Sequence, residues 1–386
     1  MRKFYTAEAV TEGHPDKLCD QIADAILDVC LKNDENSRVA CEVLATKGNI
    51  IAAGEITSAY EPDVFAVVRK VLSDIGYSSE GIAMDTFVHQ QSPDIAGAVD
   101  TSKERREGVS DNQMDWFQGA GDQGVMIGYA CDETKQLMPI PVVLANRIVR
   151  ELSACRQSSY IQGILPDGKA QVTVEYENGK PVRLDSVVVS CQHTEDKNLK
   201  KLEAEIRKKV LLPALRLLPP DEDTKIFINP SGRFVCGGMD ADTGLTGRKL
   251  MVDSYGSMVP HGGGAFSGKD CSKVDRSVAY MARYIAKNIV AARLASRCQV
   301  SLAYAIGVAQ PVMVQVDTFG TGKVCADDCL ELAIPLVFGL TPKQIVDSLR
   351  LTRPIFRQTA AFGHFGRKEF PWERTDKVEA LRNAVI

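Results

Sequence analysis

A glycine-rich segment, HGGGAFSGKD (261–270), combines residue types that bind phosphate. Gly263, Gly268 and Lys269 fit the G-x-x-x-x-G-K part of the Walker pattern, but Asp270 occupies the position of the magnesium-binding Ser or Thr. The segment is therefore either an altered P-loop or a different way of holding a polyphosphate. The other residues that could do chemistry bear on this choice.

A second segment, GHPDK (13–17), places an imidazole, a carboxylate and an ammonium at the start of a predicted helix. Free backbone N–H groups and the helix dipole at such a terminus favour anions, and Asp16 could bring a magnesium ion to the same anion. A purely structural explanation is also open, because Pro15 and Asp16 are common in helix caps and first turns. His14 taken alone is equally typical of a surface or packed histidine.

Two glutamates form a third candidate. Gly48 and Asn49 predict a two-residue turn between strands, and this register places Glu42 directly opposite Glu55. Like charges at such a position are destabilising unless a bound cation or a ligand ammonium group lies near them. Both side chains could instead point to solvent, although the neighbouring strand positions are apolar.

Two further glycine-rich segments carry charged residues. GAGDQG (119–124) allows close backbone approach to a ligand and contains Asp122, although its composition fits a plain turn as well. The segment 228–249 ends in an Arg-Lys pair that adds cations for phosphate. Asp16 and Asp275 could hold magnesium, while a solvated first helical turn is the other explanation for Asp275. The candidate positive groups are His14, Lys169, Arg248, Lys249, Lys269 and Lys273.

The elements that must position these residues recur three times in the order helix, hairpin, helix. Apolar residues at helical spacing predict the helices, and alternating runs joined by turn residues such as Asn178-Gly179 predict the hairpins. The predicted helices span residues 14–33, 61–77, 139–156, 197–215, 272–295 and 341–351, and the predicted strand pairs lie within 38–58, 171–190 and 298–320.

This repetition predicts an α+β fold of three structurally similar domains, each a mainly antiparallel sheet covered by helices on one face. Strands such as LAYAIGV are apolar on both sides, so we expect the other sheet faces to be buried against another domain or subunit. The predicted boundaries are 1–96 for an N-terminal domain, 97–117 for a flexible gate loop, 118–231 for a central domain and 232–386 for a C-terminal domain.

Composition narrows the functional class. The chain is 45% hydrophobic and 25% charged with a net charge of −4, which is ordinary for a soluble protein and gives no electrostatic footprint for nucleic acid. The N-terminus lacks a secretory apolar core and no stretch reaches about 18 apolar residues, so we expect a cytoplasmic protein that does not bind membranes. Eleven cysteines without a C-x-x-C pair favour neither disulfides nor zinc, and we expect reduced, mostly buried thiols.

Ten motifs occur in a fixed order between about residues 3 and 376: GHPDK, GEIT, QSPDI, GAGDQG, INPSGRF, GLTGRK, HGGGAFSGKD, KVDRS, YAIGVA and GHFGR. In this order they resemble the S-adenosylmethionine synthetase (methionine adenosyltransferase) family, for which GAGDQG and GGGAFSGKD are highly specific. The resemblance implies three α+β domains related by pseudo-threefold symmetry, in a homodimer or homotetramer with active sites between subunits. It also implies attack of the methionine sulfur on C5′ of ATP, giving S-adenosylmethionine, and then hydrolysis of tripolyphosphate to phosphate and diphosphate.

The resemblance further implies magnesium, two ions per site, activation by potassium, and a role for each matching residue. Catalytic roles fall on His14, Asp122, Lys169, Arg248 and Lys269. ATP contacts fall on His14, Asp167, Lys169, Arg233, Phe234, Asp242, Arg248, Lys249, Ala265 and Lys269. Methionine contacts fall on Glu55, Gln91, Asp242, Lys273 and Ile306. Asp16 and Asp275 would bind magnesium, and Glu42 would belong to the potassium site.

Two other classes of function remain alternatives at this point. A P-loop kinase or NTPase predicts a parallel sheet and a Ser or Thr after Lys269, whereas hairpins dominate this chain and Asp270 stands there. A non-enzymatic nucleotide sensor would not need the full set of cations and carboxylates. Methionine-dependent release of phosphate from ATP separates the synthetase from both.

Overall fold

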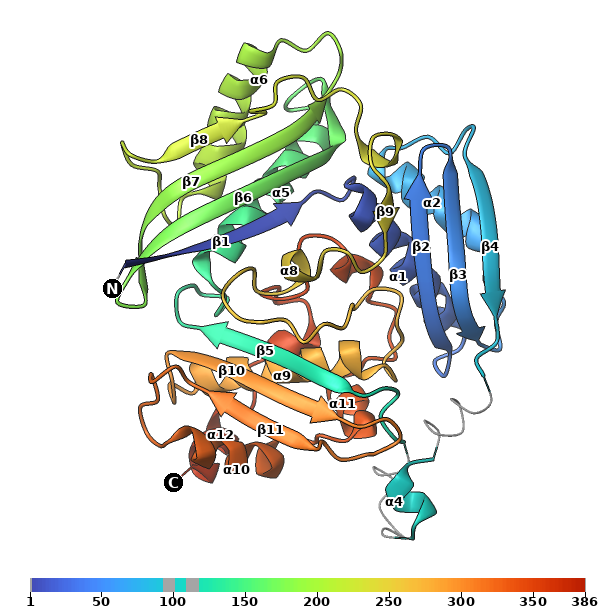
Figure 1. The fold of residues 1–386 in the computed structure, drawn as a ribbon, viewed down its shortest axis with the longest axis vertical. Coiled ribbons are helices and arrows are strands. Elements are labelled where there is room, and N and C mark those ends of the chain that lie inside the picture. The colour runs from blue at the N-terminus through green and yellow to red at the C-terminus, as the bar shows by residue number, and fades with distance from the viewer. Residues whose placement is uncertain (1, 93–100, 109–117, 386) are drawn as a thin grey trace.

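A computed structural model describes residues 2–92, 101–108 and 118–385, and it shows three β-sheets backed by helices (Figure 1). The first sheet has the order β4 (Ala83–His89), β3 (Asn49–Thr57), β2 (Arg38–Thr46), β9 (Gly244–Leu245). The second has the order β1 (Arg2–Val10), β6 (Ile164–Glu177), β7 (Lys180–His193), β8 (Lys225–Ile228). The third has the order β11 (Met313–Asp317), β10 (Arg297–Tyr304), β5 (Gly124–Cys131). The predicted α+β class, with mainly antiparallel sheets, is confirmed.

Each sheet borrows one strand from a distant part of the chain. The N-terminal segment lends β1 to the second sheet, the central segment lends β5 to the third, and the C-terminal segment lends β9 to the first. This cyclic exchange brings residues from all three repeats toward the centre of the molecule, where α8 (Leu250–Asp253) lies (Figure 1). The boundaries predicted from the sequence divide the chain, whereas the sheets are shared across them.

A long helix lies behind each sheet: α1 (Pro15–Asn33) packs on β2, α5 (Ile140–Gln157) on β6 and α9 (Val274–Ala291) on β5 (Figure 1). Residue types at the helix ends explain where some helices begin and end. Pro15 begins α1, and Gly76 ends α2 (Val64–Ile75) with a φ of 101°. The other described helical segments are α4 (Lys103–Arg106), α6 (Leu199–Ile206), the π-helix Arg207–Leu211, α7 (Leu212–Ala214), α10 (Asp327–Val337), α11 (Pro342–Leu349) and α12 (Val378–Ala384), together with the 3-10 helices Gly238–Asp240, Arg357–Thr359 and Pro371–Glu373.

The first hairpin corrects a prediction. Thr46 pairs with Asn49, so Lys47 and Gly48 form the turn, and Gly48 supplies the positive φ of 73° that the turn requires. Glu42 therefore pairs with Ala53 instead of Glu55, and the prediction that the two glutamates face each other directly is wrong. They lie on the same sheet face, offset by two residues.

The hairpin in the second sheet confirms its prediction, since β6 and β7 are joined by Asn178 and Gly179 with φ values of 51° and 79°. The predicted gate loop, 97–117, lies largely outside the described residues. Its described part, α4, contacts the turn after β10, because the Glu104 carboxylate accepts the backbone N–H of Ala309 at 2.9 Å.

Among the described helices, none is by itself long and apolar enough to cross a membrane; α10 and α11 have the length and composition only as a pair, which is bent by 76°. The cysteines are free thiols, and most of them are buried, as predicted.

Candidate active site

His14, at the start of α1, can donate a hydrogen bond to an anion. The Nδ1 atom of His14 accepts the backbone N–H of Asp16 at 3.2 Å, which places the imidazole proton on Nε2. Burial, together with the charges of Lys169 and Lys249, lowers the pKa of His14 to about 3. His14 is therefore neutral in this structure and offers an N–H donor, although the sequence had placed it among the positive groups.

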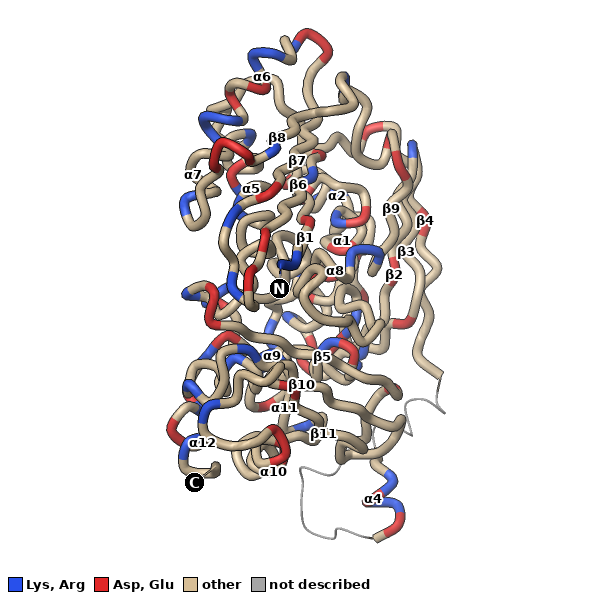
Figure 2. Tube along the Cα trace, turned by 60° about the vertical axis from the view of Figure 1, so that its left-hand side comes forward, with Lys and Arg blue, Asp and Glu red and all other residues tan. Residues whose placement is uncertain are grey.

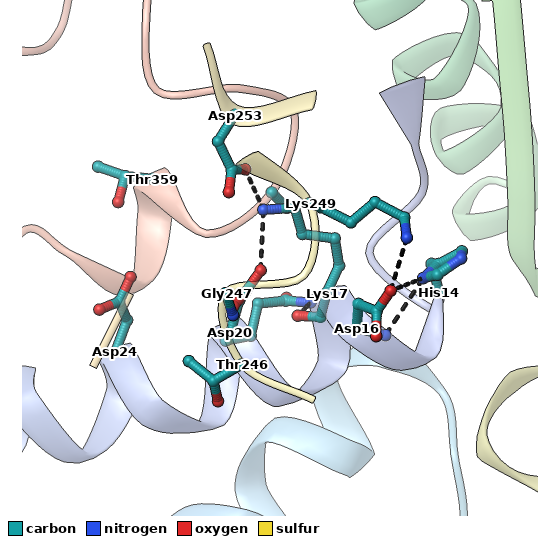
Figure 3. A network of polar contacts seen from close by, with 12 residues as sticks. His14, Asp16, Lys17, Asp20, Asp24, Thr246, Gly247, Lys249, Asp253 and Thr359 are labelled. Atoms are coloured by element: carbon teal, nitrogen blue, oxygen red, sulfur yellow. Dashed lines mark hydrogen bonds and ion pairs between the residues drawn. The ribbon is translucent and has the colours of Figure 1, made fainter. Parts of the chain in front are cut away.

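Asp16 joins α1 to the GLTGRK segment, 244–249 (Figure 3). Its Oδ2 atom accepts from Lys249 Nζ at 2.6 Å, its Oδ1 atom accepts the backbone N–H of Leu245 at 3.0 Å, and Arg248 Nη1 lies 3.7 Å from Oδ1. Burial opposes ionisation, but the Lys249 and Leu245 hydrogen bonds hold the pKa of Asp16 below its usual value. The carboxylate is thus ionised and surrounded by cations that a phosphate chain could also engage.

Four aspartates spaced by one helical turn hold loops from the C-terminal part of the chain. Asp16 holds the N–H of Leu245 at 3.0 Å, Asp20 that of Gly247 at 2.9 Å, Asp24 that of Gly268 at 2.9 Å, and Asp28 those of Phe356 and Arg357, each at 2.9 Å. The sequence prediction missed all of them except Asp16. The signal was available, since acidic residues at positions i, i+4, i+8 and i+12 share one helix face.

The same face carries buried counter-charges. Arg276 grips Asp24 through two hydrogen bonds of 2.6 and 2.8 Å, and both side chains are fully buried. Arg276, in the first turn of α9, is therefore buried and paired. α1 is not amphipathic in the usual sense, because much of its polar side is buried as well, including Asp16, Lys17, Asp20 and Asp24.

The HGGGAFSGKD loop lies along β2. Lys269 forms an isolated antiparallel bridge with Ala40, and its ammonium contacts the Asp275 carboxylate. A Cβ atom on Gly268 would come within 2.0 Å of the Cys41 carbonyl oxygen, and one on Gly264 within 2.2 Å of the Asp275 carboxylate. The glycines therefore allow close packing of the loop against β2 and Asp275.

Asp270 has a structural task. Its carboxylate is fully buried and accepts the backbone N–H of Val39 at 2.7 Å, that of Ser272 at 2.8 Å and the Lys273 ammonium at 2.7 Å. Burial alone would raise its pKa, but the charges of Lys273 and Arg38 hold the pKa of Asp270 below the usual value. The residue that breaks the Walker pattern fastens the loop to the first sheet, so this loop is not a P-loop.

Glu42 and Glu55 lie on the exposed side of the first sheet. Partial burial raises the pKa of Glu42 to about 7; the charges of Asp20 and Glu55 contribute to this rise, and Lys269 opposes it. Glu55 Oε1 lies 3.2 Å from His89 Nε2, and the backbone N–H of Gln91 donates to Thr57 Oγ1 at 3.1 Å. A cation beside Glu42 would relieve the excess of negative charge there.

The GAGDQG loop reaches the same region from the other side. A Cβ atom on Gly121 would lie 2.6 Å from the Ser272 carbonyl oxygen, which places this loop against the segment that carries Lys273. Ala120 forms a parallel bridge with Ile306, whose side chain is exposed. Asp122 is thereby carried beside the start of α9.

A third group lies around β6 and the segment after β8. The Oδ2 atom of Asp167 accepts the N–H of Gly238 at 2.9 Å, while its buried Oδ1 atom has no hydrogen-bond partner among the described residues. Burial raises the pKa of Asp167, and the charge of Asp242 adds to this effect while Lys169 opposes it. The backbone N–H of Phe234 donates to His193 Nε2 at 3.0 Å. This group provides an unused acceptor beside a cation.

The structure joins some candidate residues and separates others. Gly247 and Ala265 bring the two cation-bearing loops into contact, since a Cβ atom on Gly247 would lie 2.6 Å from that of Ala265. Arg233 instead pairs with Glu195 at the surface. Across residues 2–92, 101–108 and 118–385, no hydrogen bond or ion pair links Asp122, Glu55 or Ile306 to the His14 and Asp16 group.

Asp16 and Asp275 are suited to bind a metal ion that is already coordinated by a phosphate chain. In the described part of the chain, no three His, Cys, Asp or Glu side chains are grouped to bind a metal by themselves. Asp16 and Asp275 each hold a lysine instead, Lys249 and Lys269. Mg²⁺ is commonly bound by one or two carboxylates together with substrate phosphates and water. The residues present therefore suit a metal complex of a phosphate chain.

The fold and these groups define a three-part α+β protein that gathers cations and carboxylates for a metal-bound polyphosphate. Models of the three domains of S-adenosylmethionine synthetase match the chain: the N-terminal domain over residues 2–100, the central domain over 117–234 and the C-terminal domain over 236–374. The chain belongs to the S-adenosylmethionine synthetase family, as its motifs predicted. Its activity is that of a methionine adenosyltransferase, which makes S-adenosylmethionine from ATP and methionine, and the family uses metal ions.

Proposed function

We propose that this chain forms S-adenosylmethionine by direct attack of the methionine sulfur on C5′ of ATP and then hydrolyses the departing tripolyphosphate to phosphate and diphosphate. The sulfur is neutral and nucleophilic, so no general base is needed, and the main demand is the negative charge of the leaving chain. Cations placed around that chain stabilise the transition state more than the ground state. The observation that carries this proposal is the cluster of neutral His14, ionised Asp16 and Lys249 at the start of α1.

Two ion pairs at the site each contain a cation for phosphate and a carboxylate for a metal ion. In Lys249–Asp16 and Lys269–Asp275 the lysine can turn to a phosphate oxygen, which frees the carboxylate for a cation. His14 would donate its Nε2–H to the chain, and Lys169 and Arg248 would add charge. Asp16 and Asp275 would hold magnesium, and Glu42 would hold potassium. Bound magnesium supplies positive charge to the phosphates.

The substrate contacts are also part of this proposal. Asp167, with its free buried Oδ1 atom, Phe234 and Asp242 would hold the nucleoside. Ala265 would lie beside the phosphates, since it touches the loop of Arg248. Arg233 would have to leave Glu195 to reach ATP. Glu55, Gln91, Lys273 and Ile306 would contact methionine, Asp122 would hold a polar group of the substrates, and the segment 97–117 would act as a gate.

A second copy of the chain would complete the site in a homodimer or homotetramer. Large apolar side chains lie exposed on or beside the sheets, among them Phe87 at 64%, Val125 at 42% and Val312 at 64%. Exposed apolar sheet surface is commonly covered by a partner. We also propose the boundaries 1–96, 118–231 and 232–386 for the domains, and a cytoplasmic location.

The test is to incubate the protein with ATP, methionine, Mg²⁺ and K⁺ and to follow the sulfonium product by chromatography and phosphate release in parallel. We expect a sulfonium product and a phosphate release that depends on methionine. Absence of the sulfonium product, together with phosphate release that is indifferent to methionine, contradicts the proposed function. Omission of each cation in turn tests which ions the reaction needs.

A further inference from the structure

A buried ammonium group binds two carboxylates beside the site (Figure 3). Lys17 Nζ donates to Asp20 Oδ2 at 3.0 Å and to Asp253 Oδ1, and the three side chains are between 0 and 3% exposed. Burial alone would lower the pKa of Lys17, but the two carboxylates raise it above its usual value. Such a buried charge is tolerated only when its partners are well placed, and the two carboxylates supply those partners.

The two carboxylates lie at the two ends of the segment that carries Arg248 and Lys249. Asp20 also accepts the N–H of Gly247, the residue before Arg248, at 2.9 Å. Asp253 ends α8, which begins directly after Lys249, and its own N–H donates to the Lys249 carbonyl at 2.9 Å. Lys17 therefore binds Asp253 directly and reaches Gly247 through Asp20, so this group restrains the backbone at both ends of the segment 247–253.

The side chains of the two cations are held less firmly than their backbone. The Arg248 side chain is 50% exposed; it donates to the Thr243 carbonyl at 3.0 Å and lies 3.7 Å from Asp16. Lys249 is bound by Asp16, the carboxylate that we assign to magnesium. In the proposed function Lys249 leaves Asp16 for a phosphate oxygen, and its position then depends on the backbone of the segment 247–253.

We propose that Lys17, Asp20 and Asp253 are positioning residues that place Arg248 and Lys249 on the tripolyphosphate and retain it until it is hydrolysed. This inference rests on the proposed function and adds residues to it. In the retained step one water molecule adds across one P–O–P linkage, which breaks and gives phosphate and diphosphate. If the contacts of Lys17, Asp20 and Asp253 are weakened, intact tripolyphosphate can leave after the sulfonium product has formed.

The experiment measures intact tripolyphosphate released per sulfonium product, under saturating ATP and methionine with Mg²⁺ and K⁺. This ratio does not depend on how much of a preparation is folded, so a merely structural defect leaves it unchanged. Asp20→Ala removes both the Lys17 contact and the Gly247 hydrogen bond, and we expect the ratio to rise about tenfold, since small misplacements cost this much or more. Asp20→Asn keeps an acceptor for Gly247, and we expect a smaller rise.

Asp28→Ala is the matched control. It removes another carboxylate from the same face of α1, which also holds backbone N–H groups, but at Phe356 and Arg357, outside the cation-bearing loops. We expect it to keep the wild-type ratio. A wild-type ratio in both Asp20 variants overturns the inference, and so does an equal rise in Asp28→Ala. If Asp20→Ala does not fold, Asp20→Asn decides alone, whereas a wild-type protein that forms no sulfonium contradicts the proposed function itself.

Discussion

Replacing Asp270 by serine restores the Walker pattern in HGGGAFSGKD. We expect it to lower the free energy of unfolding without creating a P-loop. The carboxylate is fully buried and accepts from Val39 N, Ser272 N and Lys273 Nζ at 2.7 to 2.8 Å. Removing one partner of a buried charge pair costs about 3–5 kcal/mol, because the other partner is left without compensation. Lys273 is 16% exposed and can partly turn to water, so we expect about 3 kcal/mol.

The measurement is thermal and denaturant unfolding of Asp270→Ser beside the wild-type protein. At about 2 °C per kcal/mol, the expected loss corresponds to a fall in Tm of about 6 °C. Asp275→Ser is the control, since that side chain is 20% exposed and contacts Lys269; we expect a stability change below about 1 kcal/mol and a large loss of turnover. A Tm of Asp270→Ser equal to that of the wild type, or a gain of methionine-independent ATP hydrolysis, would refute the reasoning.

Three further predictions concern the candidate site, its metal ions and a buried ion pair. Lys269→Ala and Asp16→Asn should each lower turnover about 100-fold or more with little change in Tm; an equal loss of activity and of the unfolding transition would assign them to the fold. Chelation of divalent ions should abolish sulfonium formation without a change in circular dichroism, and added Mg²⁺ should restore it. The buried Glu373 carboxylate pairs with two cations of α9, Arg283 at 2.8 Å and Lys287 at 2.7 Å. Burial alone would raise the pKa of Glu373, but these two charges lower it, so its contribution to stability is present near pH 7 and lost as the pH falls below about 4.5. The Tm deficit of Glu373→Gln should therefore narrow on acidification, and a constant deficit speaks against the ion pairs.

Sequence patterns predicted those structural features that depend on residues close together along the chain. The start of α1 at Pro15, its length and the Asn178–Gly179 turn depend on caps, helical spacing and φ preferences, all of which are visible in the sequence. The first hairpin shows the limit of such reasoning. Lys47–Gly48 and Gly48–Asn49 are both acceptable turns by residue type, and packing of the sheet selected the first, which moved Glu55 opposite Ala40.

The motifs identified most of the candidate site without revealing what each residue contacts. The family, the cations and the two carboxylates assigned to magnesium were all predicted from residue types and order. That Asp270 fastens the loop to Val39, and that His14 is neutral, follow from burial and from charges brought close by folding. Neither is encoded by adjacent residues.

The sequence by itself determined the class of fold and the family, and it predicted a set of groups for binding a polyphosphate, because periodicity and motifs are local properties. Only the tertiary structure decided how those groups are held. The exchange of β1, β5 and β9 between sheets and the contacts of Lys17, Asp20 and Asp253 join residues more than 100 positions apart. Such contacts form only when the whole chain has folded, because burial makes each unpaired charge costly and so selects the partner that arrives in space.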